Sequence, residues 1–294
     1  MSICLHSSSE IKVPVKCRDR LTHSWGGFEI LKDQEEIVFN ELEQKCNKIC
    51  SNNEDIEVSN RNQCRNRFSD ITPGSKFVKI TPRDSNLDGY INANMISKYI
   101  ITQNPLYNTT SDFWQMVWEY NSRIIISLIP YVSYIPEQIS VHGNLIVKNL
   151  VPPTTYDSGS EDEYEISMPD VDNVVVTPLE LHIIGETSTR NIHHITFKGW
   201  PDRNTPNIDD LVKLCNIKDQ YNSPNMGPIV VHCMAGIGRS GCFAVYDSLR
   251  NQKYYTKDLP TLIASCIYQM RRSRKHMIQN LLQFKFLCMA LSGE

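Results

Sequence analysis

The stretch PIVVHCMAGIGRSGCFAVYDSL, residues 228–249, holds the residue types best suited to chemistry. Its apolar run predicts a buried strand, a glycine-rich loop follows, and an amphipathic pattern then predicts a helix. Converging loop N–H groups and the positive end of a helix dipole bind anions such as phosphate. The same dipoles would stabilise Cys233 as a thiolate, and Arg239 offers a two-pronged donor to phosphate oxygens. One loop therefore carries a candidate nucleophile and a candidate phosphate clamp.

A cysteine followed six residues later by an arginine carries little information alone, because the chain has ten cysteines. The alternative interpretation is a buried structural cysteine beside a tight turn. The surrounding residues favour the chemical interpretation: a strand ending in His232, glycines at 236, 238 and 241, Ser240, and a following helix. An anion-binding loop with a nucleophile needs these features together.

The stretch resembles the signature of the tyrosine-specific protein phosphatases, His-Cys-x5-Arg-Ser/Thr, here HCMAGIGRS at 232–240. RNRFSDI at 65–71 is similar to the family's phosphotyrosine-recognition loop, and DGYINANMI at 88–96 to its Tyr-Ile-Asn-Ala-Asn segment. Trp200-Pro201-Asp202 resembles the mobile loop that carries the acid, and residues 270–287 resemble the last segment with its glutamine pair. The short loops and an acidic stretch also resemble tyrosine phosphatases encoded by bracoviruses of parasitoid wasps.

The resemblance implies hydrolysis of phosphotyrosine in two steps. Cys233 would attack phosphorus, and Asp202 would protonate the departing phenolate and then activate water against the phosphocysteine. In the family Gln279 positions that water with help from Gln283, and Ser240 eases departure of the sulfur. The residues expected to hold the phosphate are Met234, Ala235, Gly236, Ile237, Gly238 and Arg239. For Asp202 alone, the alternative is an aspartate at a turn or a helix entry.

The loop at 65–71 bears on which phosphorylated residue is recognised. A deep pocket with an aromatic wall reaches phosphotyrosine, whose phosphorus lies farther from the backbone than that of phosphoserine. By resemblance Phe68 is that wall, Asp70 grips the substrate backbone, and Asn66 and Arg67 frame the loop. An aromatic residue in a polar loop is, by itself, more often a packing residue. The implied partners are phosphotyrosine-containing proteins.

Several positions depart from the family pattern. Phe68 replaces the usual Tyr and Met234 the usual Ser, so a hydrogen bond between two loops loses both partners, and we expect a working site with altered loop coupling. Arg203 follows Asp202 where an aromatic residue is usual, and we expect it to change loop closure or to favour acidic peptides. Glu137 is a weak candidate for the glutamate that braces the phosphate-binding arginine in the family.

The region before the glutamine pair also departs from the pattern. His276 falls where some members have Gly, and its side chain should narrow a second phosphate pocket beside the main one. Arg271 and Arg274 match this region, but structural ion pairs or a solvated basic helix explain them at least as well as a binding role does.

Patterns elsewhere predict the elements that position these groups. A loose helical rhythm predicts a helical region over 27–50. Alternation over 76–80 and 90–96, with Asp88-Gly89 as a turn signal, predicts a hairpin. Residues 111–122 predict a helix that leads into a strand over 123–129, buried on both faces.

The second half continues the alternation of helices and strands. Residues 179–197 predict two strands joined by a turn, and Thr205 and Pro206 are expected as the N-cap and first residue of a helix. Residues 152–172 hold seven carboxylates and no lysine or arginine, which indicates an exposed acidic loop, with a partner-binding tail as the alternative.

These elements predict an α/β fold, a single-domain twisted mixed β-sheet flanked by helices, with the site at the carboxyl end of the central strand. By resemblance this is the fold of the cysteine-dependent tyrosine phosphatases. The catalytic domain is predicted to cover residues 27–294, after a polar N-terminal segment 1–26.

The composition limits the remaining classes. Thirty basic and thirty-three acidic side chains give a net charge of -3, too balanced for a general nucleic-acid or membrane-surface binder. The longest apolar run is too short to span a membrane, and the N-terminus lacks a secretory signal. Scattered cysteines without zinc spacing predict reduced thiols and no metal or other cofactor. We expect a cytoplasmic monomer, in the host-cell cytoplasm if the chain is viral.

The first functional hypothesis is an active protein-tyrosine phosphatase that needs no metal. The alternative is a protein that captures phosphotyrosine without turning it over. Met234, Arg203 and the lack of a recognisable glutamate to brace the phosphate-binding arginine favour this alternative. A dual-specificity phosphatase is disfavoured by the recognition loop around Phe68, which enzymes with shallow pockets lack.

Overall fold

The computed structural model describes residues 30–49, 53–74, 77–83, 86, 88–151, 173–252 and 258–292. The polar segment 1–26 and the acidic stretch 152–172 lie outside these residues. What the sequence predicts for them stays a prediction, as do the boundaries of the catalytic domain.

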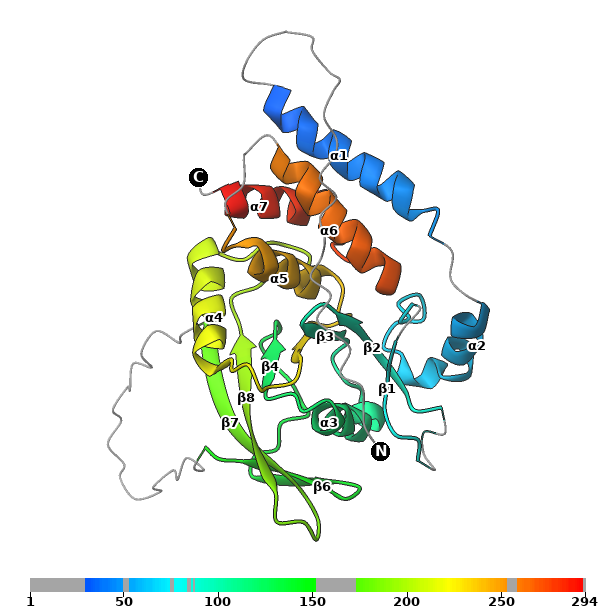
Figure 1. Ribbon diagram of the computed structural model, residues 1–294, viewed down its shortest axis with the longest axis vertical. Coiled ribbons are helices and arrows are strands. Elements are labelled where there is room, and N and C mark those ends of the chain that lie inside the picture. The colour runs from blue at the N-terminus through cyan, green and yellow to red at the C-terminus, as the bar shows by residue number, and fades with distance from the viewer. Residues whose placement is uncertain are drawn as a thin grey trace, which may run out of the picture.

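Nine strands of the described chain form one sheet in the order β1-β2-β3-β9-β4-β8-β7-β6-β5 (Figure 1). The central strands β3, β9, β4 and β8 are parallel, and the strands on both sides pair antiparallel. The strands are β1 (Phe77–Lys79), β2 (Tyr90–Ile96), β3 (Tyr99–Thr102), β4 (Ile124–Ser127), β5 (Ile139–His142), β6 (Leu145–Asn149), β7 (Val174–Ile183), β8 (Thr189–Phe197) and β9 (Ile229–His232). The predicted mixed sheet is confirmed.

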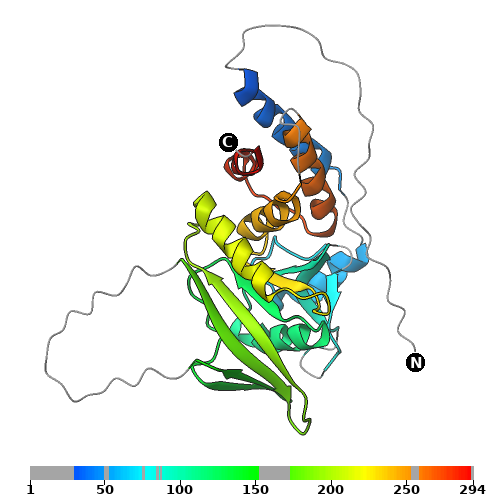
Figure 2. The same cartoon turned by 60° about the vertical axis from the view of Figure 1, so that its left-hand side comes forward.

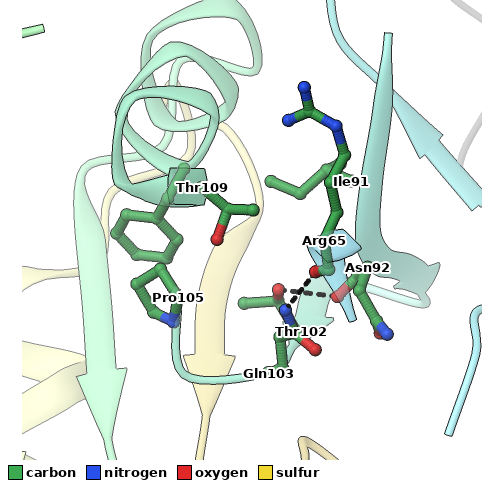
Figure 3. Close-up of a pocket in the computed structure, with 8 residues that line it drawn as sticks. Arg65, Ile91, Asn92, Thr102, Gln103, Pro105 and Thr109 are labelled. Carbon is green, nitrogen blue, oxygen red and sulfur yellow. Dashed lines mark hydrogen bonds between the residues drawn. The ribbon is translucent and has the colours of Figure 1, made fainter. Parts of the chain in front are cut away.

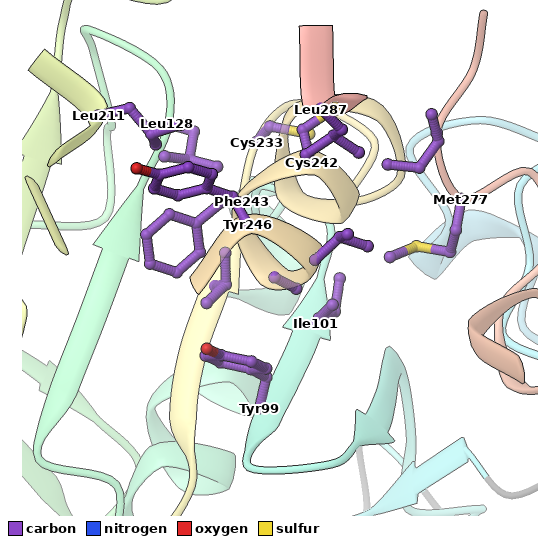
Figure 4. Close-up of a cluster of buried hydrophobic side chains, with 14 of the residues drawn as sticks. Tyr99, Ile101, Leu128, Leu211, Cys233, Cys242, Phe243, Tyr246, Met277 and Leu287 are labelled. Atoms are coloured by element: carbon purple, nitrogen blue, oxygen red, sulfur yellow. The ribbon is translucent and has the colours of Figure 1, made fainter. Parts of the chain in front are cut away.

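Helices cover both faces of this sheet (Figures 1 and 2). On one face α3 packs through Phe113 and Trp114, and on the other α4, α5, α6, α7 and α1 enclose a larger core around Phe243 (Figure 4). The helices are α1 (Ile30–Cys46), α2 (Asn53–Arg61), α3 (Thr110–Glu119), α4 (Ile208–Tyr221), α5 (Gly238–Leu249), α6 (Leu259–Ser273) and α7 (Leu281–Ser292), with short 3-10 turns η1 (Gln63–Arg65) and η2 (Tyr107–Thr109). The α/β fold flanked by helices is confirmed.

The strand before the candidate nucleophile lies at the centre of the sheet. All four residues of β9 are buried, as are all four of β4, because helices cover both faces of these parallel strands. His232, the last residue of β9, is in register with Thr102 of β3 and Ser127 of β4. The loop after His232 therefore leaves the sheet where the carboxyl ends of three strands meet, the usual place for a ligand site in parallel sheets.

Most of the predicted elements are present. Helix α1 lies inside the predicted 27–50 region, α3 and β4 follow as expected, and β7 pairs with β8. The hairpin of β1 and β2 is confirmed as well. Gly89 has a φ of +59°, and a Cβ there would lie 2.1 Å from the Ile80 carbonyl oxygen, so this turn requires glycine.

One helix start was wrongly predicted, and one hairpin was missed. The N-cap of α4 is Asn207, not Thr205, because the Asn207 side chain accepts a hydrogen bond from the Asp209 N–H at 2.7 Å. The helix consequently begins at Ile208 rather than at Pro206. Strands β5 and β6 were not predicted, although a Gly-Asn pair at 143–144 between short alternating runs is a hairpin signal.

Candidate active site

The loop between β9 and α5 carries Cys233, which is 3% exposed and lies at the edge of the larger core (Figure 4). Its path depends on Gly236, whose φ is +69°. A Cβ at that position would lie 2.1 Å from the Thr102 carbonyl oxygen, so no other residue fits. Helix α5 begins at Gly238, which brings its unpaired N-terminal N–H groups to the loop.

Arg274 holds the loop backbone from behind and is fully buried. Its guanidinium donates to the carbonyl oxygens of Gly236 at 2.7 Å and Ala235 at 2.8 Å, and to Asn94 Oδ1 at 3.1 Å. C=O and N–H of a trans peptide point in opposite directions, so the N–H groups following these carbonyls point away from Arg274. Burial lowers the pKa of Arg274 to about 10, so the side chain stays charged at neutral pH. Arg274 thereby fixes the side of the loop on which these N–H groups lie.

Cys233 ionises more easily than an ordinary thiol. Burial raises its pKa, but hydrogen bonds from the hydroxyl and N–H of Ser240, the charge of Arg239 and the N–H of Ile237 lower it by more. The net pKa lies below the usual value. The Ser240 side chain is fully buried, and of these contacts its hydroxyl lowers the pKa of Cys233 most.

The acid candidate lies against the phosphate clamp. Arg239 donates through Nη2 to Asp202 Oδ1 at 2.8 Å and through Nη1 to the Trp200 carbonyl oxygen at 3.1 Å. The Asp202 side chain is 74% exposed, whereas that of Arg239 is nearly buried. The structure thus brings Asp202, Arg239 and Cys233 to one place although Asp202 is some thirty residues away along the chain.

Two contacts anchor the loop that carries Asp202. The Trp200 ring is buried against Phe197, and its Nε1 donates to the Asn204 carbonyl oxygen at 2.9 Å. Arg203 has a φ of +54°, and its carbonyl oxygen accepts from Asn280 at 3.3 Å. A hydrogen bond from Trp200 therefore joins the two ends of the loop, and Asn280 connects the loop to the segment that carries the two glutamines.

The predicted glutamines reach the start of α5. A Cβ at Gly238 would lie 2.5 Å from Gln279 Oε1 and 3.0 Å from Gln283 Nε2, so glycine permits both amides to approach. Gln283 is fully buried, and its Oε1 accepts from the Gln279 N–H at 2.9 Å. Its Nε2 has no hydrogen-bond partner within the described ranges. An unpaired buried amide donor here is available to an anion or to water.

The recognition loop is anchored on the segment that follows β3. Arg67 donates from its N–H to Gln103 Oε1 at 2.9 Å and from its guanidinium to the carbonyl oxygens of Asn104 and Pro105, both at 3.0 Å. The Asn104 N–H donates to the carbonyl oxygen of Met234 at 3.1 Å. One segment therefore ties the recognition loop to the nucleophile loop, even without a bond between Phe68 and Met234.

A small pocket behind this segment shows how the recognition loop is held (Figure 3). Gln103 donates to the Arg65 carbonyl oxygen at 2.8 Å, and Thr102 donates to that of Asn92 at 2.8 Å. Asn66 accepts hydrogen bonds from Tyr90 and Asn92. Phe68 is 39% exposed and Asp70 is also exposed, which leaves both free to contact a substrate.

Two further expectations concern residues beside the site. Glu137 is exposed, and no hydrogen bond or ion pair joins it to Arg239 in the residues that the structure describes. Arg271 pairs with Glu43 of α1 at 2.7 Å and donates to two backbone carbonyls, so its structural interpretation holds. His276, at a φ of +61°, lines a separate cavity of about 180 Å³ together with Arg271.

A comparison with protein families matches residues 62–292 to the protein-tyrosine phosphatase model. The chain belongs to this family. The tyrosine phosphatase match covers the recognition loop, the acid loop, the nucleophile loop and the glutamine segment described above.

Individual phosphatases show the same relationship. Tyrosine-protein phosphatase 2 of Dictyostelium discoideum is 34% identical over 223 residues, 70% of this chain and 55% of that protein. Receptor-type tyrosine-protein phosphatase R of Homo sapiens is 32% identical over 253 residues, 79% of this chain but 35% of that protein. Tyrosine-protein phosphatase non-receptor type 7 of Mus musculus is 31% identical over 268 residues, 84% of this chain and 69% of that protein. The chain thus spans little more than half of the Dictyostelium protein and about a third of the human protein.

These comparisons support the phosphatase family and do not support the bracovirus subgroup. Short loops and an acidic composition are features that distant members of one family can share. Within the described residues no group of three histidine, cysteine or carboxylate side chains could hold a metal ion. No helix in the same residues is long and apolar enough to cross a membrane.

Sequence reasoning missed two features of this phosphatase site. It left open whether Arg274 binds substrate or has a structural role, whereas Arg274 holds the backbone of the loop between β9 and α5. It also passed over Tyr134 and His194: Tyr134 lies within hydrogen-bond distance of His232, the residue before the nucleophile, and of His194. A histidine on the polar-looking run NIHHITF was the available signal, but nothing in the sequence placed it beside β9.

Proposed function

We propose that this family member hydrolyses phosphotyrosine in proteins through a phosphocysteine intermediate. The observation that carries the proposal is that Cys233, whose pKa is lowered, lies on the loop before α5 close to Arg239, which is itself hydrogen-bonded to Asp202. A buried thiol without that function would have its pKa raised, as burial does for Cys215 and Cys242.

In the first step the Cys233 thiolate attacks phosphorus in line with the bond to the tyrosine oxygen. The S–P bond forms as the P–O bond breaks, and Asp202 donates its proton to the leaving phenolate. Loop N–H groups and Arg239 hold the three equatorial oxygens, where charge develops. The chemistry needs no metal, because thiolate, guanidinium and backbone donors supply nucleophile and charge stabilisation.

In the second step water attacks the phosphocysteine. Asp202, now a carboxylate, accepts a proton from the water, the S–P bond breaks, and phosphate leaves with the thiolate restored. The side-chain amides of Gln279 and Gln283 approach Gly238, the first residue of α5, where they can orient that water. Ser240 stabilises the departing thiolate through its hydroxyl.

Phe68 and Asp70 support a preference for phosphotyrosine over phosphoserine. Both are exposed on a loop that Arg67 ties to the nucleophile loop through Asn104. An aromatic side chain on this loop can form one wall of a pocket for the phosphotyrosine ring. A thiolate nucleophile also requires a reducing compartment, which supports cytoplasmic phosphotyrosine proteins as substrates.

The pairing of Asp202 with Arg239 favours one alternative function. If the carboxylate stays on the guanidinium when a phosphopeptide is bound, the protein captures phosphotyrosine without releasing phosphate.

The test is phosphate release from matched phosphotyrosine and phosphoserine peptides with chelator present. Turnover of the phosphotyrosine peptide alone is expected, abolished in Cys233→Ser and lowered about 100-fold or more in Asp202→Ala. Cys266→Ser and Asp219→Ala are the matched controls, since they alter a cysteine and an arginine-paired carboxylate away from the loop. Binding of the phosphotyrosine peptide without turnover would instead support the capturing protein.

A further inference from the structure

The described sheet ends in two outer strands, β1 and β5, which differ in how well they resist pairing with another chain. Strand β1 is three residues long, its register with β2 is irregular, and it ends in the charged Lys79. Short length, irregular pairing and lysine are devices that keep an outer strand from pairing further. Strand β5 has a regular register with β6 over all four residues and contains no lysine or proline. An outer strand of this kind can accept a strand from another chain.

The side chains on the outer surface of β5 are apolar. Ile139 is 60% exposed and Val141 is 59% exposed. They alternate with Ser140 and His142, which are partly buried and whose Oγ and Nε2 atoms lie 2.9 Å apart. His142 also lies near the Trp114 ring of α3. The surface of β5 that faces away from α3 therefore carries two adjacent β-branched apolar side chains that the described residues leave uncovered.

The free backbone groups of β5 belong to the same two residues. Successive residues of an antiparallel strand direct their N–H and C=O groups to alternate sides. The carbonyl oxygen of Gln138 accepts from the N–H of Asn149, next to β6, at 2.7 Å, so every second residue from Gln138 onward directs its groups to β6. Ile139 and Val141 direct theirs to the free side. This side of β5 thus offers two N–H donors and two carbonyl acceptors.

Antiparallel pairing of β5 with β5 of a second copy would match these groups. In a two-fold arrangement centred on Ser140, Ile139 of each copy lies opposite Val141 of the other, and the two residues exchange N–H···O bonds. Four hydrogen bonds form, and two apolar cross-strand pairs lie on the outer surface. A register shifted by two residues would put Val141 opposite Glu137, or Ile139 opposite Gly143. The register centred on Ser140 therefore pairs both apolar side chains with apolar side chains.

Charge complementarity supports the same register. It places Glu137 opposite Gly143 of the second copy, a position that Arg83 borders: a Cβ at Gly143 would lie 3.6 Å from Arg83 Nη1. Glu137 is exposed and forms no ion pair within the residues that the structure describes. A carboxylate of one copy would therefore approach a guanidinium of the other at both ends of the paired strands.

We propose that the protein forms a two-fold dimer through β5, which joins the two sheets into one. The sequence predicted a monomer instead. A single pair of strands buries less surface than a standard interface, so we expect a weak dimer with a Kd between about 1 μM and 1 mM. Four strands lie between β5 and β9, and β6 lies at the opposite end of the molecule from α1 (Figure 1). The dimer does not use the loop of Cys233, so this inference is independent of the proposed function.

The first experiment is sedimentation equilibrium of the full chain with reductant, over that range of concentrations. We expect the apparent mass to rise from 33.8 kDa toward twice that value. Ile139→Lys should weaken dimerisation about 10-fold or more, because it places a charge opposite Val141 of the second copy. Ile37→Lys is the matched control, since this residue of α1 is 56% exposed, and it should associate like the parent. A parent that stays monomeric, or equal weakening in both variants, would overturn the proposal.

The second experiment tests the register through a disulfide. In the proposed pairing the two Ser140 residues lie opposite each other with Cα atoms about 4.5 Å apart, within reach of a disulfide. The two Ile139 residues are offset along the strands, with Cα atoms about 8–9 Å apart, beyond that reach. Ser140→Cys should therefore form an inter-chain disulfide when diamide takes up the hydrogens of two thiols, and Ile139→Cys is the matched control.

Non-reducing electrophoresis of the two cysteine variants and the parent measures the rate of cross-linking. We expect the cross-linked dimer to form about 10-fold faster or more in Ser140→Cys than in Ile139→Cys or in the parent. Equal rates in the two variants would contradict the register centred on Ser140. Both measurements are independent of turnover, so they decide the dimer whether or not the protein releases phosphate.

Discussion

Nη2 of Arg239 lies 2.8 Å from Oδ1 of Asp202, so the candidate phosphate clamp is paired with the candidate acid. A phosphate group that binds to Arg239 must compete with this carboxylate for the same guanidinium. Because Asp202 is largely exposed, the ion pair costs little to break. We therefore expect phosphate binding to Arg239 to be coupled to the release of Asp202.

Removing the Asp202 carboxylate should strengthen binding of a phosphotyrosine peptide. Loss of an exposed ion pair frees up to about 1 kcal/mol, which corresponds to about 5-fold in affinity. The measurement is titration calorimetry of Cys233→Ser against Cys233→Ser/Asp202→Ala, with Cys233→Ser/Asp219→Ala as the control. Weaker binding to the Asp202 variant would show that the carboxylate does not compete with phosphate.

Replacing Ser240 by alanine should raise the pKa of Cys233. The Ser240 hydroxyl is the strongest of the contacts that lower this pKa against the effect of burial. The apparent pKa from iodoacetate alkylation should move toward the ordinary thiol value of about 8.5, and turnover near pH 6 should fall. Ser122→Ala is a matched control, since that hydroxyl is as fully buried as the Ser240 hydroxyl but lies outside the site. A parent-like alkylation profile in Ser240→Ala would assign the low pKa to the backbone and Arg239.

The sequence predicted the elements whose signals are local. The buried β9, the glycine loop and α5 form one continuous stretch, so pattern and chemistry could be interpreted together. The start of α4 was misplaced by two residues because Thr205 and Asn207 are both good caps, and only the fold decides which N–H groups need one.

Residues that act through tertiary contacts could not be predicted in this way. Arg274 lies 38 residues from the Gly236 carbonyl that it holds, and Tyr134 lies 98 residues from His232. Neither distance leaves a pattern in one sequence, because the contact depends on how α6 and the segment after β4 pack around the sheet. The family resemblance identified the candidate catalytic residues but not the residues that hold them in place.

Replacing Arg274 by lysine should weaken both the fold and phosphate binding. A lysine keeps the charge but cannot donate in a planar fork to the carbonyls of Ala235 and Gly236. Leaving such buried acceptors unpaired costs about 1–3 kcal/mol of unfolding free energy. Urea unfolding and inhibition by vanadate measure the two effects, with the exposed Arg272→Lys as the control. If Arg274→Lys matched the control in both, the arginine would not be shaping the loop.

Asp247 should stabilise the fold in a pH-dependent way. This buried carboxylate lies 2.7 Å from Lys218 Nζ and contacts Tyr99, Lys98 and Arg250. Burial raises its pKa, but Lys218 and the other donors lower it by more, so the net pKa lies below the usual range. The stabilisation is therefore complete above the unfolded pKa of about 3.9 and is lost as the pH falls toward the folded value.

The measurement for Asp247 is urea unfolding of the parent and of Asp247→Asn at pH 7 and near pH 3. We expect a loss of about 3 kcal/mol at pH 7 and a smaller difference at the lower pH. Asp219→Asn, at a half-exposed carboxylate in the same cluster, should cost less than about 1 kcal/mol. A difference that stays constant with pH would mean that the charge of Asp247 is not what stabilises the fold.

Phe68 and Met234 should behave as a coupled pair when hydroxyls are restored. Both side chains are nearly two-fifths exposed, so water can satisfy a single new hydroxyl, and Phe68→Tyr or Met234→Ser alone should change kcat/KM less than about 3-fold. The double variant can form a hydrogen bond between the recognition loop and the nucleophile loop, worth about 1 kcal/mol. A double-mutant cycle on kcat/KM for a phosphotyrosine peptide should therefore give a favourable coupling. Additive effects would show that Arg67, Asn104 and the Met234 carbonyl already couple the two loops fully.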